Sequence, residues 1–283
     1  MTMRAPIAEQ RFVLDHVAGI ADLARSECFA HADSDTVDAV LEGVAQFAAG
    51  EYAPTNRTGD TVMPRWDNGV VTMPPGFRQA YQACVEGGWN GAEAPMEHGG
   101  MGLPYALSSV VLETLGTANM GLTLINLLTA GAVHALEAYG SEMQKAIWLP
   151  RLVSGEWNGT MNLTEPGAGS DVGALRTTAE PVAEGENAGL WKIKGQKIFI
   201  TFGEHDLTDN IVHLVLARTP DAPAGTKGIS LFLVPKLRLD ADGKPTIANG
   251  VRCLSIEHKL GIHSSPTCVM AYGEDADSLG ELI

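Results

Sequence analysis

The feature that most constrains the fold of this 283-residue chain is a change in hydrophobic periodicity near residue 158. Before that point, apolar residues recur every three or four positions, as on one face of a helix. After it, short β-branched runs are separated by Gly, Pro and Asp, as in strands joined by turns. The sequence therefore predicts an α+β multidomain chain, with an all-α helical domain over residues 1–158 and a β domain over residues 159–283.

Within the first domain, Asp33 and Ser141 stand where N-cap residues would begin helices that run to residues 47 and 153. The other helices are expected over residues 7–29, 74–85, 106–117 and 121–139, and residues 51–73 are expected to form a loop. The helix over 121–139 is strongly apolar, but its length and flanking turns favour a buried core helix over a membrane span.

Strand-like runs in the second domain cover residues 191–194, 197–200, 211–217, 229–234 and 269–272. No helical pattern separates them, so a β-α-β sheet is disfavoured. The spacing favours an antiparallel β-barrel or sandwich.

Composition excludes several kinds of protein. A net charge of −15, with no cluster of Lys and Arg, argues against a nucleic-acid-binding surface. The chain opens on a charged helix instead of an apolar leader, which favours a cytoplasmic location without membrane insertion. Its four Cys are widely scattered and His258 and His263 are five residues apart, so we expect reduced thiols and no metal site.

Two short segments carry the chemistry of this sequence. The first runs from Met161 to Asp171 and combines small residues, which let backbone N–H groups approach a ligand, with the hydroxyls of Thr164 and Ser170. The second is Phe199-Ile200-Thr201, in which strand alternation would place the ring and the hydroxyl on one face. Taken alone, the first predicts only a turn and the second only a half-buried strand. Their spacing along the chain makes them informative together.

These segments belong to a set of five motifs that resembles the acyl-CoA dehydrogenase family. The sequence most resembles the larger bacterial subgroup of the family, which includes methylmercaptopropionyl-CoA dehydrogenases. That family has a helical domain, a central β domain and a C-terminal helical domain, and the resemblance implies that the third is absent from this chain. The five motifs are residues 95–104, 164–171, 195–201, 228–235 and 259–264.

The resemblance implies FAD as cofactor, with Thr164 near the pyrimidine side of the flavin, Phe199 packed on its ring and Thr201 near N5. It places Ser170 at the thioester of an acyl-CoA substrate and Thr219 near the nucleotide end of CoA. Glu165 is expected to brace the loop instead of acting as an acid or base. The full set of expected cofactor contacts is Met161, Leu163, Thr164, Gly169, Ser170, Phe199, Ile200 and Thr201.

The implied reaction is FAD-dependent α,β-desaturation of an acyl-CoA, in fatty acid metabolism, with an electron-transfer flavoprotein as acceptor and a homo-oligomeric parent. No residue here matches the family's catalytic Glu, so we expect this chain alone to be nearly inactive. Two alternatives remain open: a non-catalytic flavin- or CoA-binding module or partner subunit, and a flavin oxidase or mono-oxygenase of the same fold.

Overall fold

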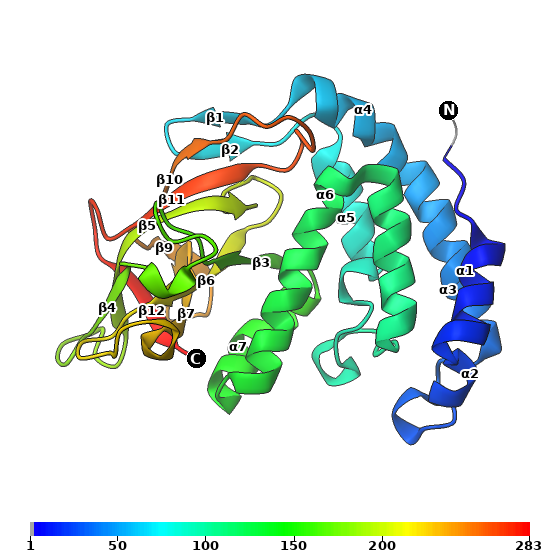
Figure 1. Ribbon diagram of the computed structural model, residues 1–283, viewed down its shortest axis with the longest axis horizontal. Helices are drawn as coiled ribbons and strands as arrows, with labels where there is room; N and C mark the ends of the chain where they lie inside the picture. Colours follow the sequence, from blue (N-terminus) through cyan, green and yellow to red (C-terminus); the bar gives the residue numbers. More distant parts are fainter. Residues whose placement is uncertain (1–2) are drawn as a thin grey trace.

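The computed structural model describes residues 3–283 and has helices on one side and strands on the other (Figure 1). Helix α6 stands between the two parts and packs against both helices and strand β3 (Figure 1). The prediction of a helical domain followed by a β domain is confirmed. The last helix ends at Val153 and the first strand of the large sheet begins at Trp157.

Most of the predicted helices are present, with their start signals in place. The Asp33 carboxylate accepts a hydrogen bond from the Thr36 N–H at 2.9 Å, and Ser141 forms a capping box with Gln144. The helix expected over residues 7–29 is instead broken at Gly19, which has a φ of 66°. The helices are α1 Ile7–Val13, α2 Ile20–Leu23, α3 Ser34–Phe47, α4 Ala53–Val62, α5 Phe77–Glu86, α6 Tyr105–Tyr139 and α7 Glu142–Val153, with π-helical turns at Leu14–Ala18 and Ala48–Tyr52.

Helix α6 is the predicted pair of apolar helices, joined across a kink at Asn119. The Asn119 side chain accepts from the Leu122 N–H and donates to Thr55 Oγ1 at 2.8 Å, which satisfies groups freed by the kink. By length and hydropathy α6 could cross a membrane, but 56% of its most apolar window is buried inside the protein. Its contacts with α3, α4, α7 and β3 are those of a core helix.

The prediction of a loop over residues 51–73 is wrong, because this stretch forms α4 and a hairpin of β1 Arg65–Asp67 and β2 Val70–Thr72. Tertiary packing overrides the poor helix propensity of α4, because Gly59 lets Phe77 and Ser264 approach its backbone. The hairpin turns at Asn68-Gly69, both with positive φ. That dipeptide was a readable turn signal in the sequence.

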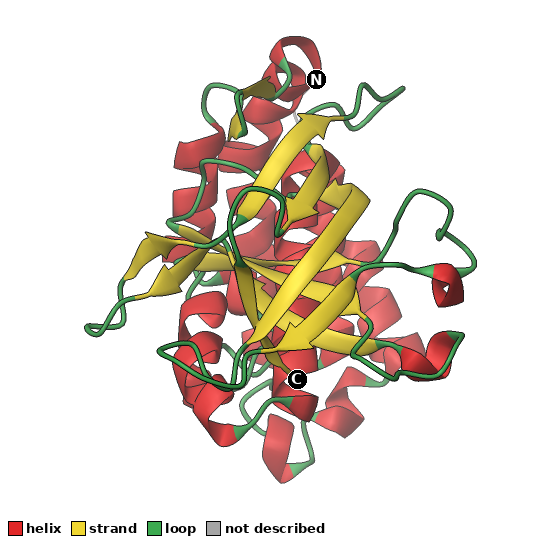
Figure 2. Ribbon diagram, turned by 90° about the vertical axis from the view of Figure 1, so that its left-hand side faces the viewer, coloured by secondary structure: helices red, strands yellow, loops and turns green. Residues whose placement is uncertain are grey.

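The large sheet has the order β10-β11-β5-β12-β7-β6-β3, with β4 also paired to β5. It is mostly antiparallel, as predicted, except that β3 runs parallel to β6. It does not close into a barrel, since β10 and β3 lie at opposite ends of the order. Figure 2 shows the strands in front of the helices. The strands are β3 Trp157–Asn162, β4 Thr178–Pro181, β5 Trp191–Thr201, β6 Asn210–Ala217, β7 Ser230–Pro235, β10 Val251–Ile256, β11 Thr267–Tyr272 and β12 Ser278–Leu282, with β8 Leu237–Leu239 and β9 Pro245–Ala248 as a separate ribbon.

Two glycines near the contact of α6 with β3 should respond oppositely to Ala. Gly131 lies exposed inside α6 with open space around a Cβ, so Gly131→Ala should stabilise the chain by about 0.5–1 kcal/mol. A Cβ on Gly159 would lie 2.3 Å from the Ala132 Cβ, so Gly159→Ala should destabilise by about 1–3 kcal/mol. Urea unfolding followed by circular dichroism measures both, and equal effects would contradict the packing described here.

Candidate functional site

The Gly-rich segment after β3 folds into a tight turn. Glu165 and Ala168 exchange both backbone hydrogen bonds, at 3.2 and 2.9 Å, across Pro166 and Gly167. Pro fixes φ at the first central position and Gly167, with φ of 85°, takes the left-handed second position, which is the pattern of a type II turn. Nothing lies within 4 Å of a Cβ built on Gly167 or Gly169, so the outer side of the turn is open.

The Glu165 side chain fixes this turn to the segment that follows it, in agreement with the prediction that Glu165 stabilises the loop. Its side chain is buried and accepts hydrogen bonds from the N–H groups of Arg176 and Thr177, at 2.6 and 3.1 Å, and from Thr177 Oγ1 at 2.5 Å. It also accepts from Lys197 Nζ at 2.7 Å. Burial alone would raise the pKa of Glu165, but the bonds from Lys197, Thr177 and Arg176 outweigh it and hold that pKa below its ordinary value.

Lys197 is the residue of this site that sequence reasoning missed. It lies on β5 with 0% of its surface exposed, and its ammonium also donates to the Leu163 carbonyl at 3.1 Å. A signal existed, because strand alternation puts residue 197 on the buried face with Ile193. Burial lowers the pKa of Lys197, and the bond to Glu165 partly offsets that effect.

The end of β5 presents an aromatic ring on a strained backbone. Phe199 has a φ of 60° and is 57% exposed, while its neighbour Ile200 is buried. The register against β11 shifts here, since Lys197 and Ile200 pair with residues only two apart, so β5 carries one extra residue. Strain of this kind persists where surrounding contacts enforce it and is concentrated at functional sites.

The structure brings the two predicted segments together. The Ile198 N–H donates to the Thr164 carbonyl at 2.9 Å, and the Thr160 hydroxyl donates to the Thr201 carbonyl at 2.6 Å. Strand β3 and the segment after it are thus bonded to the end of β5, at one residue before Phe199 and at one after it. Met161 and Thr164 are half-buried, and Leu163 is 42% exposed.

Polar groups in these segments are left free by the rest of the chain. Within residues 3–283, no hydrogen bond is formed by the hydroxyls of Thr164, Ser170 or Thr201, or by the Thr164 N–H. Donors that are accessible, close together and without a partner can bind an external acceptor at little cost. An exposed ring beside them adds an apolar surface for a planar ligand.

The two predicted substrate residues lie on different segments of the β domain. Ser170 is exposed after the turn, and Thr219 follows β6. Its neighbour Arg218 donates to the carbonyls of Leu175 and Gly173, and so fastens the segment after Ser170 to the end of β6. The assignments of individual residues to cofactor or substrate stay predictions.

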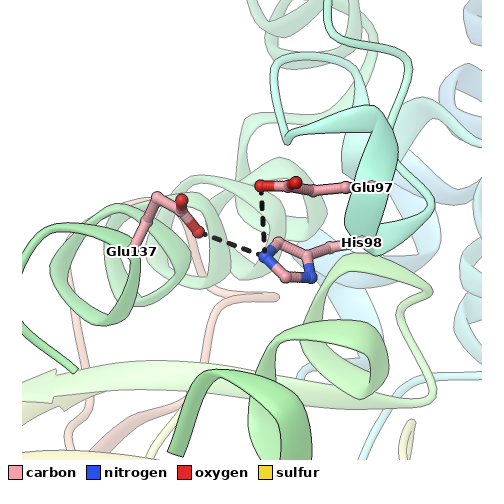
Figure 3. Close-up of side chains that lie close together, drawn as sticks. All are labelled: Glu97, His98 and Glu137. Atoms are coloured by element: carbon pink, nitrogen blue, oxygen red, sulfur yellow. Dashed lines mark ion pairs between the residues drawn. The ribbon is translucent and has the colours of Figure 1, made fainter. Parts of the chain in front are cut away.

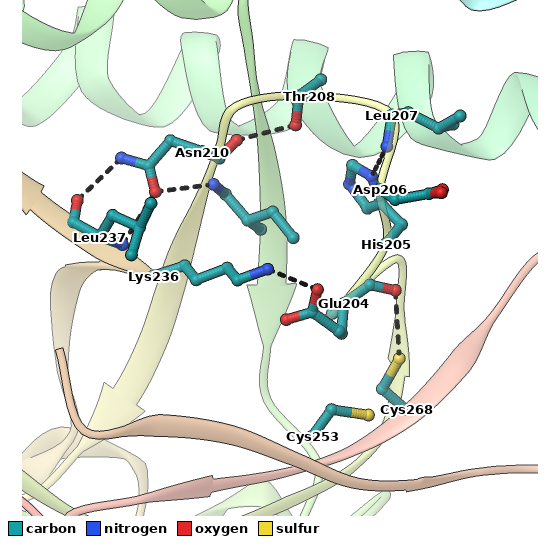
Figure 4. Close-up of polar contacts among 12 residues, drawn as sticks. Glu204, His205, Asp206, Leu207, Thr208, Asn210, Lys236, Leu237, Cys253 and Cys268 are labelled. Atoms are coloured by element: carbon teal, nitrogen blue, oxygen red, sulfur yellow. Dashed lines mark hydrogen bonds and ion pairs between the residues drawn. The ribbon is translucent and has the colours of Figure 1, made fainter. Parts of the chain in front are cut away.

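A second group of polar contacts lies around residues 204–210, in the segment that joins β5 to β6 (Figure 4). Lys236 Nζ contacts Glu204 at 2.5 Å, and His205 Nε2 lies 2.7 Å from Asn158 Oδ1. Burial raises the pKa of Glu204 despite the Lys236 charge. Burial lowers the pKa of His205 to about 3, and Lys236 adds to that shift. These residues support the sheet and do not join the two segments above.

His98 lies between two carboxylates (Figure 3). Its Nε2 is 3.4 Å from Glu137 Oε2 on α6 and 3.9 Å from Glu97 Oε1. Three ligand-type atoms meet here, but Glu97 is exposed and precedes His98 directly in the chain. We interpret the group as ion pairs that hold residues 97 and 98 on α6, and the absence of a metal site stays a prediction.

The fifth motif, residues 259–264, helps to line a cavity of about 390 Å³ that it shares with α4 and the kink of α6. His263 Nδ1 lies 2.7 Å from Asp60 Oδ1, and its Nε2 lies 2.9 Å from the Lys259 carbonyl. None of the lining residues belongs to the two segments around Thr164 and Phe199.

Comparison with known proteins gives consistent matches. Two family models cover the chain: acyl-CoA dehydrogenase, N-terminal domain, over residues 34–156, and acyl-CoA dehydrogenase, middle domain, over residues 160–273. The 3-methylmercaptopropionyl-CoA dehydrogenase of Ruegeria pomeroyi is 46% identical over 272 residues, which are 96% of this chain and 46% of that protein. The chain thus spans about half the length of this curated relative.

Solved structures match as well. An acyl-CoA dehydrogenase from Bacillus anthracis complexed with FAD has a TM-score of 0.68 at 27% identity, over 88% of this chain and 38% of that one. A structure described as the electron transferring flavoprotein of Acidaminococcus fermentans has a TM-score of 0.68 at 28% identity, over 88% of this chain and 58% of that one. With both of its domains matched in order, this chain belongs to the acyl-CoA dehydrogenase family.

Proposed function

We propose that this chain forms one wall of an FAD site and one part of an acyl-CoA site in an acyl-CoA dehydrogenase. The observation that carries the proposal is the meeting of the strained, exposed Phe199 with unbonded donors on Thr164 and Thr201. A planar flavin needs an aromatic or apolar face to pack on and donors along its edge. Relatives in the family and a matched structure complexed with FAD support this choice of cofactor.

In the proposed arrangement, Phe199 packs on the flavin ring and the free N–H and hydroxyl of Thr164 donate to its pyrimidine side. Thr201 donates near N5. A flavin bound here would supply the acceptor for the hydride from the β-carbon of the substrate. The donors that Thr164 fixes at its pyrimidine side would favour the reduced cofactor, in which negative charge lies on that side.

The substrate is proposed to be an acyl-CoA thioester, contacted by Ser170 and, at its nucleotide end, by Thr219. The resemblance to the family assigns the α-proton to a Glu outside residues 1–283. We propose that this chain supplies binding and orientation and that the base comes from elsewhere. An electron-transfer flavoprotein as acceptor, a homo-oligomeric parent, a role in fatty acid metabolism and a cytoplasmic location complete the proposal.

The test is FAD binding measured by quenching of flavin fluorescence. Phe199→Ala should weaken binding roughly tenfold, because aromatic stacking contributes about 0.5–1.5 kcal/mol beyond burial of area. Tyr105→Ala, which removes another exposed ring at the start of α6, is the matched control and should leave the affinity unchanged. A wild-type chain that binds no FAD, or equal losses in both variants, would overturn the proposed site.

Adding an acyl-CoA to the flavin-loaded chain separates the functional alternatives. No bleaching of the flavin band by the chain alone is expected if the base lies outside it. Bleaching would show that the chain is catalytic by itself. Binding of FAD without any response to acyl-CoA, even in the full-length parent, would favour the alternative of a flavin-binding module or an oxidase.

A further inference from the structure

The buried Lys197 makes a contact that the bracing role of Glu165 does not require. Its ammonium bonds both to Glu165 Oε1 at 2.7 Å and to the Leu163 carbonyl at 3.1 Å. The loop is already held by the three bonds that Arg176 and Thr177 donate to Glu165. The bond to Leu163 therefore points to a second effect.

The Leu163 carbonyl and the Thr164 N–H belong to the same peptide group. A peptide whose oxygen accepts a hydrogen bond from a cation is polarised, and its N–H becomes a stronger donor. Lys197 is 0% exposed, so water does not screen this bond. The N–H at the other end of the peptide has no partner within residues 3–283.

We propose that Lys197 is a positioning residue that acts through the Leu163–Thr164 peptide to strengthen the Thr164 N–H as a donor to a reduced flavin. The inference rests on the proposed function, because it needs the pyrimidine side of the flavin to face Thr164. Through-space attraction by Lys197 is small, since the Glu165 carboxylate at 2.7 Å balances its charge. The effect travels through the polarised peptide.

The first measurement is the flavin reduction potential in the FAD-loaded protein. Lys197→Met keeps an unbranched side chain one heavy atom shorter than that of lysine and removes its charge. It should reduce the preference for reduced over oxidised FAD by roughly tenfold, which lowers the two-electron potential by about 30 mV. FAD should still bind, because Phe199, Thr164 and Thr201 remain.

The control is a second lysine–glutamate pair, in which the Glu204 carboxylate is buried and the Lys236 side chain is 32% exposed. Lys236 contacts Glu204 at 2.5 Å and has no bond to the loop. Lys236→Met should cost stability and leave the potential unchanged. If Lys197→Met fails to fold because Glu165 is left unpaired, Lys197→Met combined with Glu165→Gln removes both charges and should show the same lowered potential.

The second measurement needs no FAD. In the apo chain, the Thr164 amide proton should move upfield in Lys197→Met, and in the double variant, but not in Lys236→Met. A wild-type chain that binds no FAD would contradict the proposed function. The amide shift would then be the only test of the effect of Lys197 on the Leu163–Thr164 peptide. An unchanged Thr164 amide shift in Lys197→Met, or an unchanged potential with FAD bound, would overturn the role of Lys197.

Discussion

Acidification from neutral pH to about pH 4 is expected to remove several kcal/mol of stability from this chain, through two fully buried histidines. Burial lowers the pKa of His205 to about 3 and that of His213 to about 4. Burial keeps each ring neutral. It outweighs the carbonyls of Gly203 and Val234, which lie 2.8 and 3.2 Å from the His213 ring nitrogens and favour its charged form. An unfolded histidine titrates near pH ~6.5.

The sign follows from proton binding. Both folded-state pKa values lie below the unfolded value, so between about pH 6.5 and about pH 4 the unfolded chain binds protons that the native rings do not. Stability therefore falls as the pH falls, by about 3 kcal/mol for each ring at about pH 4. Burial raises the pKa values of Glu204 and Glu281, which opposes this slope. The net loss is smaller than the sum of the two histidines.

A variant isolates the contribution of one ring. His213→Gln retains a donor for the Gly203 carbonyl and cannot titrate. Measured by urea unfolding at about pH 7 and about pH 4, the wild type should lose about 3 kcal/mol more than the variant between the two conditions. If the variant does not fold, imidazole NMR signals serve instead: His205 and His213 should stay neutral at about pH 5. Titration of these two rings near pH ~6.5 would contradict their burial.

Local chemistry made much of the helical domain predictable. Asp33 and Ser141 cap helices because their short polar side chains reach the free N–H groups of the first turn. The prediction of a loop over residues 51–73 failed because α4 is rich in poor helix formers and is stabilised by packing against Phe77. The hairpin in this stretch turns at Asn68-Gly69, a dipeptide typical of hairpin turns, so the sequence did contain a signal for it.

In the β domain, the strands could be predicted from the sequence but their pairing and register could not. Strand positions follow from composition, but the parallel pairing of β3 with β6 joins residues some fifty positions apart, and no local pattern encodes it. The extra residue in β5 beside Phe199 is likewise set by the register with β11. The two segments were predicted to act together from a family resemblance. The contacts that join them, through Lys197 and Thr160, required the structure.

The largest single-site loss is expected for Glu165→Ala. The substitution leaves the buried Lys197 ammonium without its carboxylate, and the Arg176 and Thr177 N–H groups without acceptors. Removing one partner of a buried pair typically costs about 3–5 kcal/mol. Glu165 is 5% exposed and Lys197 0%, so little solvent can reach the site to compensate.

An exposed ion pair of similar length provides the control. Lys192 and Asp277 are 2.8 Å apart but about half exposed, so Asp277→Ala should cost no more than about 1 kcal/mol. Both variants are compared with the wild type by urea unfolding at neutral pH. A loss below about 1 kcal/mol for Glu165→Ala would mean that the Gly-rich turn is held by its backbone alone. The larger loss would mean that the geometry of the proposed flavin site depends on the buried Glu165–Lys197 pair, so that the substitution would lower both the stability of the chain and its proposed affinity for FAD.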